Sequence, residues 1–247
     1  MWTREQLKTN GKMAFSRNYW ECVAVALIMG FFSGVPNFAA VKKNLETQRA
    51  SLSEFGLYGS SVDMSELYQS LTMAISLFTV FGLLITAVFV LLKLLVGNAL
   101  MVGGNLFFIE NRNGGRGFGI AASSFRSGRY GNIVLTMFLM DLFISLWSLL
   151  LIIPGIIKSY EYLMVPYILA ENPQMDRKEI FEISRRMMDG EKMNAFLLDL
   201  SFLGWIFLTV LTCGVAGILY VQPYMMATRT ELYIYNKVKA YNEGYIA

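Results

Sequence analysis

The sequence predicts an all-α fold: a polytopic membrane helix bundle of about six transmembrane helices, arranged as three parallel helical-hairpin units with amphipathic helices at the membrane interface. Hydrophobic residues make up 55% of the 247 residues and charged residues only 16%, whereas an average soluble domain carries roughly 25% charged residues. The mean hydropathy of +0.47 agrees with this balance. Long apolar runs and a residue pattern that recurs along the chain indicate membrane helices in repeated units.

The composition also excludes several classes of active site. The chain has no histidine, which removes histidine-based triads, general bases and metal ligands. Its two cysteines, Cys22 and Cys213, lie in separate apolar stretches, so neither a disulfide framework nor a cysteine metal site is expected. No phosphate-binding glycine loop or catalytic motif is visible, and the small net charge of +3 gives no reason to expect nucleic acid as a partner. We expect a protein that is not an enzyme and uses no metal or cofactor.

The first two predicted spans lie in the N-terminal half. An apolar segment over 19–35, ended by Pro36, is expected to be an uncleaved first span, because the residues after it offer no clean small-x-small cleavage site. A polar stretch over 37–70 follows and is predicted to be an extracytoplasmic loop. The apolar run over 71–109 exceeds one span, so it predicts either one long helix that projects from the membrane or a helix broken near Gly97.

Four further spans are predicted in the C-terminal half. The glycine- and arginine-rich segment over 111–129 is expected to be a loop with a short helix, and Pro154 with Gly155 makes a turn between the third and fourth spans. The four spans are predicted over 133–153, 156–170, 195–211 and 215–235.

The positions of Lys and Arg predict the orientation. With six spans, sixteen of these residues fall on one side of the membrane, in the N-terminal segment, in 111–130, in 177–192 and at the C-terminal end. The other side carries only Lys42, Lys43, Arg49 and Lys158. Because positively charged loops stay in the cytoplasm, we expect a multi-pass protein of the bacterial plasma membrane with both termini cytoplasmic.

An internal repeat divides the chain into similar parts. Residues 138–142 match residues 196–200, and in each copy a tryptophan follows the aspartate by six positions and a Pro-Tyr pair comes later. The sequence predicts a single membrane domain over 1–247 in which each unit starts in the cytoplasm, although chance similarity between apolar helices is the alternative. The units are 1–111 (with the loop 37–70), 112–172 and 173–247, and the first is the weakest copy.

Ionisable residues within predicted spans are candidates for function, because they are costly to insert. Asp141 and Asp199 are equivalent in the repeat, so they form a candidate proton or cation site, with hydrogen bonding to neighbours as the structural alternative. Lys93 either reaches the interface or pairs with one of these aspartates. Lys158 and Glu161 are three residues apart and are expected to form an ion pair.

The Pro-Tyr pairs form a second group of candidates. A proline in a helix frees the carbonyl four residues earlier, here that of Tyr162 or Leu219. Such carbonyls bind a cation or let the helix hinge, and an ordinary kink is the alternative. The neighbouring tyrosines either line a cavity or pack. The candidates are Pro166, Tyr167, Pro223 and Tyr224.

The polar segment over 175–191 predicts an amphipathic helix. Asp176 and Glu179 have the spacing of a capping box, and Gly190 is a helix stop. One face is apolar and is expected to rest on the membrane, with arginines near the lipid phosphates; a plain connector is the alternative. The apolar residues are Ile180, Ile183, Met187 and Met188, and the lipid-interface candidates are Arg177, Arg185 and Arg186.

Motifs at 131–132, 150–155, 160–167, 184–190, 201–205 and 222–224 carry a resemblance that covers most of the chain, best from about 110 to 235. The sequence resembles a bacterial family of integral membrane proteins catalogued as domain of unknown function 975. This resemblance implies a six-span plasma-membrane protein, and it supplies no activity, substrate or catalytic residue.

These observations favour a protein that moves or senses a small or amphipathic molecule through a cavity between helical repeats. The alternative is a structural or regulatory membrane protein whose basic cytoplasmic amphipathic helices bind anionic lipid or a partner. The expected partners are membrane lipids and either another membrane protein or a second copy of the chain.

Overall fold

The computed structural model describes residues 2–33, 64–115, 117–126 and 128–246, and the regular elements in these ranges are all helical. Most of the predicted loop over 37–70 lies outside the described residues. The helices are α1 (Arg4–Arg17), α2 (Tyr19–Ser33), α4 (Met64–Leu92), α5 (Asn98–Arg112), α6 (Ser123–Arg126), α7 (Tyr130–Leu150), α8 (Ile152–Glu161), α9 (Val165–Glu171), α10 (Arg177–Met187), α11 (Lys192–Leu200), α12 (Leu203–Leu211) and α13 (Gln222–Asn242). Shorter elements are the π-helices η1 (Lys93–Gly97) and η3 (Gly217–Val221) and the 3-10 helix η2 (Phe118–Ala122).

The chain forms two compact units. One consists of Gly34–Lys93, of which α4 is the described part, and the other of Met1–Ser33 with Leu94–Ala247. The packing described below is that of the larger unit. The predicted division into three repeat units stays a prediction.

Three helices in the described residues are long and apolar enough to cross a membrane. They are Tyr68–Arg112, Tyr130–Leu150 and Lys192–Leu211, and Tyr19–Phe31 is a shorter apolar helix. The described part of the chain is therefore all-helical, with helices that have the length and composition of membrane spans. The apolar run over 71–109 is not broken at Gly97, since a π-helical turn at Lys93–Gly97 keeps it helical.

The predicted span over 156–170 is not one helix. It is divided between α8 and α9 by a turn at residues 162–164, where the amide of Val165 donates to the carbonyl of Tyr162 (3.1 Å). Pro166 explains the division, because proline lacks an amide hydrogen and its ring clashes with the carbonyl four residues earlier. Pro166 is instead tolerated in the first turn of α9.

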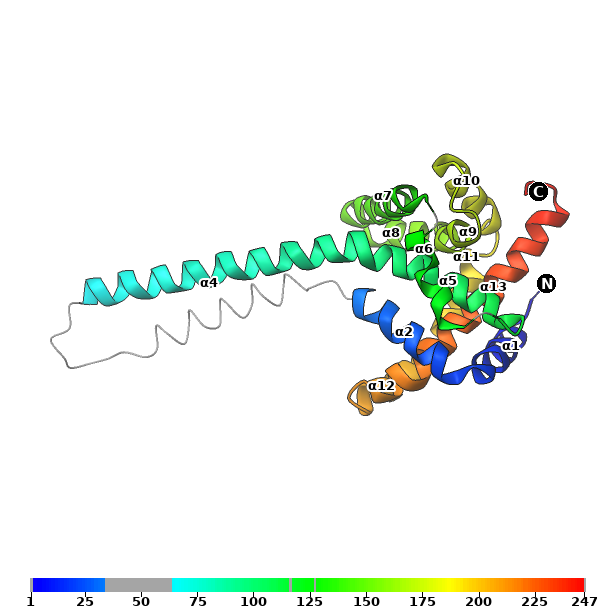
Figure 1. Cartoon of the computed structure of the whole chain (residues 1–247), viewed down its shortest axis with the longest axis horizontal. Helices are drawn as coiled ribbons and strands as arrows, with labels where there is room; N and C mark the ends of the chain where they lie inside the picture. The colour runs from blue at the N-terminus through cyan, green and yellow to red at the C-terminus, as the bar shows by residue number, and fades with distance from the viewer. Residues whose placement is uncertain (1, 34–63, 116, 127, 247) are drawn as a thin grey trace. The chain divides into compact units, whose positions relative to one another are not determined.

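Helix α13 runs through the larger unit and packs against α1, α2, α5 and α10 (Figure 1). Its contact with α1 is close: a Cβ atom at Gly11 would lie 2.8 Å from the Cα atom of Thr228. Leu7 and Phe15 of α1 are buried beside this contact. The polar side chains of α13 also join it to several other helices, as described below.

Helix α5 forms the second centre of the larger unit. It packs against η2, α9, α2 and α7, and Val102, Phe107 and Phe108 are at most 2% exposed. The apolar area removed from water at such positions is the main stabilising contribution to the unit. Between α5 and its neighbours, however, the packing leaves a cavity.

Candidate functional site

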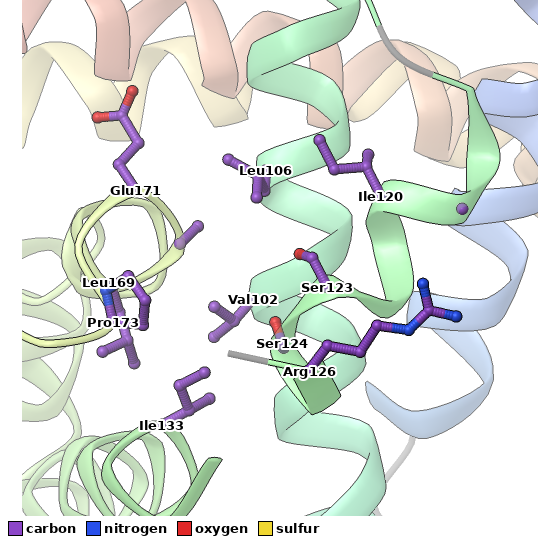
Figure 2. Close-up of a pocket in the computed structure, with 12 residues that line it drawn as sticks. Val102, Leu106, Ile120, Ser123, Ser124, Arg126, Ile133, Leu169, Glu171 and Pro173 are labelled. Atoms are coloured by element: carbon purple, nitrogen blue, oxygen red, sulfur yellow. The ribbon is translucent and has the colours of Figure 1, made fainter. Parts of the chain in front are cut away.

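A cavity of about 540 Å³ lies where α5 meets η2, α6, α7 and α9. Figure 2 shows α5 in the middle, with Leu169 and Glu171 on one side of it and Ile120, Ser123 and Arg126 on the other. Half of the lining residues are aliphatic, as in sites that hold small apolar or amphipathic molecules. The aliphatic residues are Val102, Leu106, Ile120, Ile133, Leu169 and Ala170, and the polar ones are Ser123, Ser124, Arg126 and Glu171.

A close helix contact forms one wall of the cavity. At Gly103 of α5 an added Cβ atom would overlap the carbonyl oxygen of Ala121 and lie 2.8 Å from its carbonyl carbon. Only glycine permits this approach of α5 to η2. The contact places Ser123 and Arg126, which follow in α6, along the rim of the cavity.

The two charged residues that line the cavity, Glu171 and Arg126, differ in their partners within the protein. Glu171 accepts hydrogen bonds from the hydroxyl of Tyr233 and the ammonium group of Lys237, both at 2.6 Å. Arg126 is exposed, and none of the ion pairs among the described residues includes it. The carboxylate is therefore neutralised from within the protein, while the guanidinium group is available to an anion.

Another hollow, of about 490 Å³, lies at the start of α7. It is lined by Arg129 and Arg177, one of the predicted lipid-interface residues, together with Asn132 and Gln174. The amide of Asn132 donates to the carbonyls of Pro173 (3.0 Å) and Met175 (3.2 Å), and Arg129 donates to Gln174 (3.1 Å). These bonds fix the loop before α10.

Asp199, a predicted proton or cation site, is part of an ion pair. Both of its carboxylate oxygens accept hydrogen bonds from the guanidinium group of Arg229, at 3.1 and 3.0 Å, and the hydroxyl of Tyr160 donates to it at 3.0 Å. This arrangement joins α11 to α13 and α8. It agrees with the structural alternative that the sequence left open.

We expect Asp199→Asn to lower the free energy of unfolding by about 1–2 kcal/mol, because Arg229 loses its charged partner at a partly exposed site. The midpoint of unfolding in mixed detergent micelles, followed by circular dichroism, measures this. Asp189→Asn is the matched control, since Asp189 is exposed. Equal losses in the two variants would show that the ion pair contributes nothing.

The predicted site also includes Asp141 and Lys93. Asp141 is half-buried on α7 and has an interaction of its own. Lys93 belongs to the other compact unit. A joint site of Asp141 and Asp199 stays a prediction, and so does a pair of either aspartate with Lys93.

Pro166 and Tyr167 are packing residues in α9. Both are buried, and the ring of Tyr167 stacks on that of Tyr233 at 5.1 Å. Burial raises the pKa of Tyr167 to about 12, so the hydroxyl is neutral at physiological pH. The Tyr162 carbonyl is the acceptor of the turn described above, so it already has a partner in the chain.

Pro223 and Tyr224 have a corresponding role in α13. The π-helical turn η3 precedes Pro223, and the hydroxyl of Tyr19 donates to the carbonyl of Leu219 at 2.9 Å. The freed carbonyl thus binds a side chain of α2. Tyr224 packs edge-on against Phe202 at 5.2 Å.

Glu161 is the centre of a charge cluster that joins α8, α10 and α11. Its carboxylate is only 6% exposed and accepts hydrogen bonds from Lys158 (2.8 Å), Arg185 (2.9 Å) and Lys192 (3.2 Å). Burial by itself would raise the pKa of the Glu161 carboxyl, but the hydrogen bonds and charges of Lys158 and Lys192 outweigh it and hold that pKa below its usual value.

The cluster confirms the predicted pair of Lys158 and Glu161, and it adds Arg185 and Lys192 to that pair. The six-span topology sets Lys158 on the face opposite to Arg185 and Lys192, whereas the structure binds all three to one carboxylate. The turn at residues 162–164 is the physical reason, because α8 ends before it has run the length of α7.

The amphipathic helix over 175–191 is present as α10, with Asp176 as its N-cap. The Asp176 carboxylate accepts a hydrogen bond from the backbone amide of Lys178. The predicted contact of its apolar face with lipid is wrong, because Ile180, Ile183 and Met187 are at most 6% exposed and belong to the protein core. Of the predicted lipid-interface residues, Arg185 binds Glu161, Arg186 pairs with Glu182, and Arg177 lines the hollow at α7.

Several residues of the charged network were not identified from the sequence. Arg229 and Glu231 lie within the predicted span 215–235. Because ionisable residues are costly to insert into a membrane, their position in a span could have identified both as candidates. Glu231 pairs with Arg112 (2.8 Å). The cavity residues Ser123 and Arg126 gave no such signal, because they are ordinary residues of a basic loop.

Comparison with known proteins identifies one family. The family model described as "Protein of unknown function (DUF975)" matches residues 7–242 of the chain. No curated protein and no solved structure matches it.

Proposed function

Because the chain belongs to the DUF975 family, whose function is unknown, we propose a function from the geometry of the cavity. The protein binds an amphipathic anion there, as a step in moving or sensing that molecule, and it does so without catalysing a reaction. The observation that carries the proposal is the aliphatic cavity with Arg126 at its rim. An acyl chain fits the aliphatic wall, and a phosphate or carboxylate fits the guanidinium group.

The position of the cavity supports this function. It lies between α5, which ends the first predicted repeat unit, and the helices of the second unit. Sites between repeats are common in transporters. The predicted candidates Asp141, Asp199, Lys93, Pro166, Tyr167, Pro223 and Tyr224 do not line it, so the proposed ligand contacts are those of Val102, Leu106, Ser123 and Arg126.

We also propose that the protein resides in the bacterial plasma membrane with both termini in the cytoplasm. The basic segments around Arg126 and Arg185 and at both ends of the chain support this orientation. The cluster at Glu161, in which Lys158 and Arg185 bind one carboxylate, supports the same side for Lys158. Arg126 would then lie where an anionic headgroup of the inner leaflet can reach it.

Titration of the purified, delipidated chain tests the cavity. We expect dioctanoyl phosphatidylglycerol to bind more tightly than dioctanoyl phosphatidylcholine, as measured by native mass spectrometry. Arg126→Gln should lower the affinity for the anionic lipid by about tenfold, because a charge-assisted hydrogen bond contributes roughly 1.5–3 kcal/mol. Leu106→Trp should weaken binding of both lipids, because the larger ring narrows the cavity.

Arg4→Gln is the matched control, because Arg4 is exposed on α1 and does not line the cavity. Equal losses in Arg126→Gln and Arg4→Gln would show nonspecific attraction to positive charge. Equal affinity for the two lipids would overturn the proposal.

The alternative function, binding of anionic lipid or a partner by the basic helices, has one supporting observation. The exposed face of α10 carries Lys178 and Arg186. The same titration separates the two functions: Arg186→Gln lowers the affinity if α10 is the binding surface, and Arg126→Gln lowers it if the cavity is.

A further inference from the structure

Two helical hairpins of the larger unit end in exposed apolar tips. Hairpin A comprises residues 142–157, where α7 turns into α8, and hairpin B comprises residues 200–221, where α12 turns into η3. Neither segment contains a charged residue. At the tip of hairpin A, Leu149 is 85% and Ile152 is 76% exposed, and at the tip of hairpin B, Val210 is 70% exposed. Such surfaces are unstable in water and indicate contact with lipid.

The arms of both hairpins are short for a membrane crossing. In hairpin A, α7 contributes the nine residues 142–150, and in hairpin B α12 also has nine residues, so each of these arms is about 14 Å long at about 1.5 Å per residue. A full crossing of the hydrocarbon core requires about 30 Å. Each arm therefore matches the depth of one leaflet.

Charged side chains mark the level at which the arms begin. At the base of hairpin A, Lys158 and Glu161 meet Arg185 and Lys192, whose side chains are 58% and 31% exposed. At the base of hairpin B, Asp199 meets Arg229. A charged residue at the bilayer centre costs roughly 2.5–3.5 kcal/mol, so these bases lie at the headgroups and not within the core.

The turn of hairpin B is built for an environment without water. The amides of Thr212, Cys213, Gly214 and Val215 donate to carbonyls of the same hairpin, and the amide of Ala216 donates to the Thr212 hydroxyl (3.0 Å). Backbone groups in hydrocarbon need such internal partners. In hairpin A, Pro154 has no amide hydrogen to satisfy, and the amide of Gly155 donates to Leu151 (3.2 Å).

Both hairpins are closed by the same kind of contact. Gly155 of α8 approaches Ser148 of α7, where an added Cβ would lie 2.7 Å from the serine Cα. Gly217 of η3 likewise approaches Thr209 of α12. Each hydroxyl donates to the carbonyl four residues earlier, Ile144 (2.8 Å) or Trp205 (3.0 Å). Small residues at a close contact are typical of helix pairs in lipid.

We propose that hairpins A and B are re-entrant anchors, which insert into the acyl chains of one leaflet from the face that carries the charge clusters and return to that face. Helices α7 and α11–α12 are long enough to cross, but part of each belongs to the protein body: Ile133 and Met137 of α7 are buried, as are Ala195 and Leu198 of α11. The tips lie near the bilayer midplane. This arrangement places Lys158 with the other basic residues on the cytoplasmic side.

The native Cys213 at the tip of hairpin B provides the test, since it is exposed and the other cysteine, Cys22, is buried. The full chain is treated with a membrane-impermeant maleimide in spheroplasts and in inverted vesicles. We expect Cys213 to react at least about tenfold more slowly from either side than after detergent solubilisation, because a thiol in hydrocarbon does not ionise. Cys213→Ser gives the background.

A double variant, Lys178→Cys with Cys213→Ser, reports the side of α10, and Leu150→Cys with Cys213→Ser repeats the test for hairpin A. A fluorophore placed at either tip should be quenched more by nitroxides near the end of the acyl chains than by headgroup nitroxides. Labelling of a tip from the side opposite to position 178 would show a full crossing and overturn the proposal. Labelling from the same side as position 178 would show a hairpin in water and overturn it as well.

Discussion

Replacing Glu161 by glutamine is expected to lower the free energy of unfolding by about 3 kcal/mol. The substitution keeps the shape of the side chain and removes the charge that Lys158, Arg185 and Lys192 share at a site only 6% exposed. Removing one partner of a buried ion pair typically costs roughly 3–5 kcal/mol. Because the three cations are partly exposed, we expect the loss for Glu161→Gln to lie at the lower end of this range. The midpoint of reversible unfolding in mixed detergent micelles is the measurement.

Glu182→Gln provides the matched control, because it breaks an ion pair on the same helix. Glu182 and Arg186 are both more than half exposed, so this change should cost at most about 0.5 kcal/mol. A loss in Glu161→Gln no larger than that in Glu182→Gln would mean that the cluster does not hold α8, α10 and α11 together.

Gly103→Ala is expected to destabilise the protein by about 2–3 kcal/mol, although the same change in an ordinary helix position stabilises it by up to about 1 kcal/mol. The new Cβ atom would overlap the carbonyl oxygen of Ala121. Because that atom belongs to the backbone, α5 and η2 must move apart as whole elements. The same displacement widens the cavity wall that carries Ser123 and Arg126, so the affinity for the anionic lipid should fall too.

Gly131→Ala is the control for this prediction. Gly131 lies in the first turn of α7, and no atom lies within 4 Å of a Cβ added there. The two substitutions should therefore have opposite signs in the same unfolding experiment. A stabilising Gly103→Ala would show that α5 and η2 do not approach as closely as the structure indicates.

The sequence predicted local features well where neighbouring residues determine them. The helical class and the membrane character follow from composition, Asp176 caps α10, and Lys158 pairs with Glu161 three residues away. Pro166 was identified as a point of disruption, and it divides the predicted fourth span into α8 and α9. Each of these features depends on residues within a few positions of one another.

The predictions that failed depend on distant residues. An amphipathic pattern states that one face of α10 is apolar, but it does not state whether lipid or protein covers that face. In the structure, protein covers it. In the same way, no pattern along the chain predicts that Lys158 shares one carboxylate with Arg185 and Lys192.

The sequence by itself determined the helical class, the membrane character and which residues are costly to bury, because these properties depend on composition and on interactions within one helix. The tertiary structure alone decided which charges meet, that α5, α6 and α9 enclose a cavity, and how far the apolar hairpins extend beyond the charged clusters. These depend on contacts between residues such as Trp2 and Glu191, which are 189 positions apart and bonded at 3.0 Å. The free energy of such contacts depends on how whole helices pack, which no local pattern specifies.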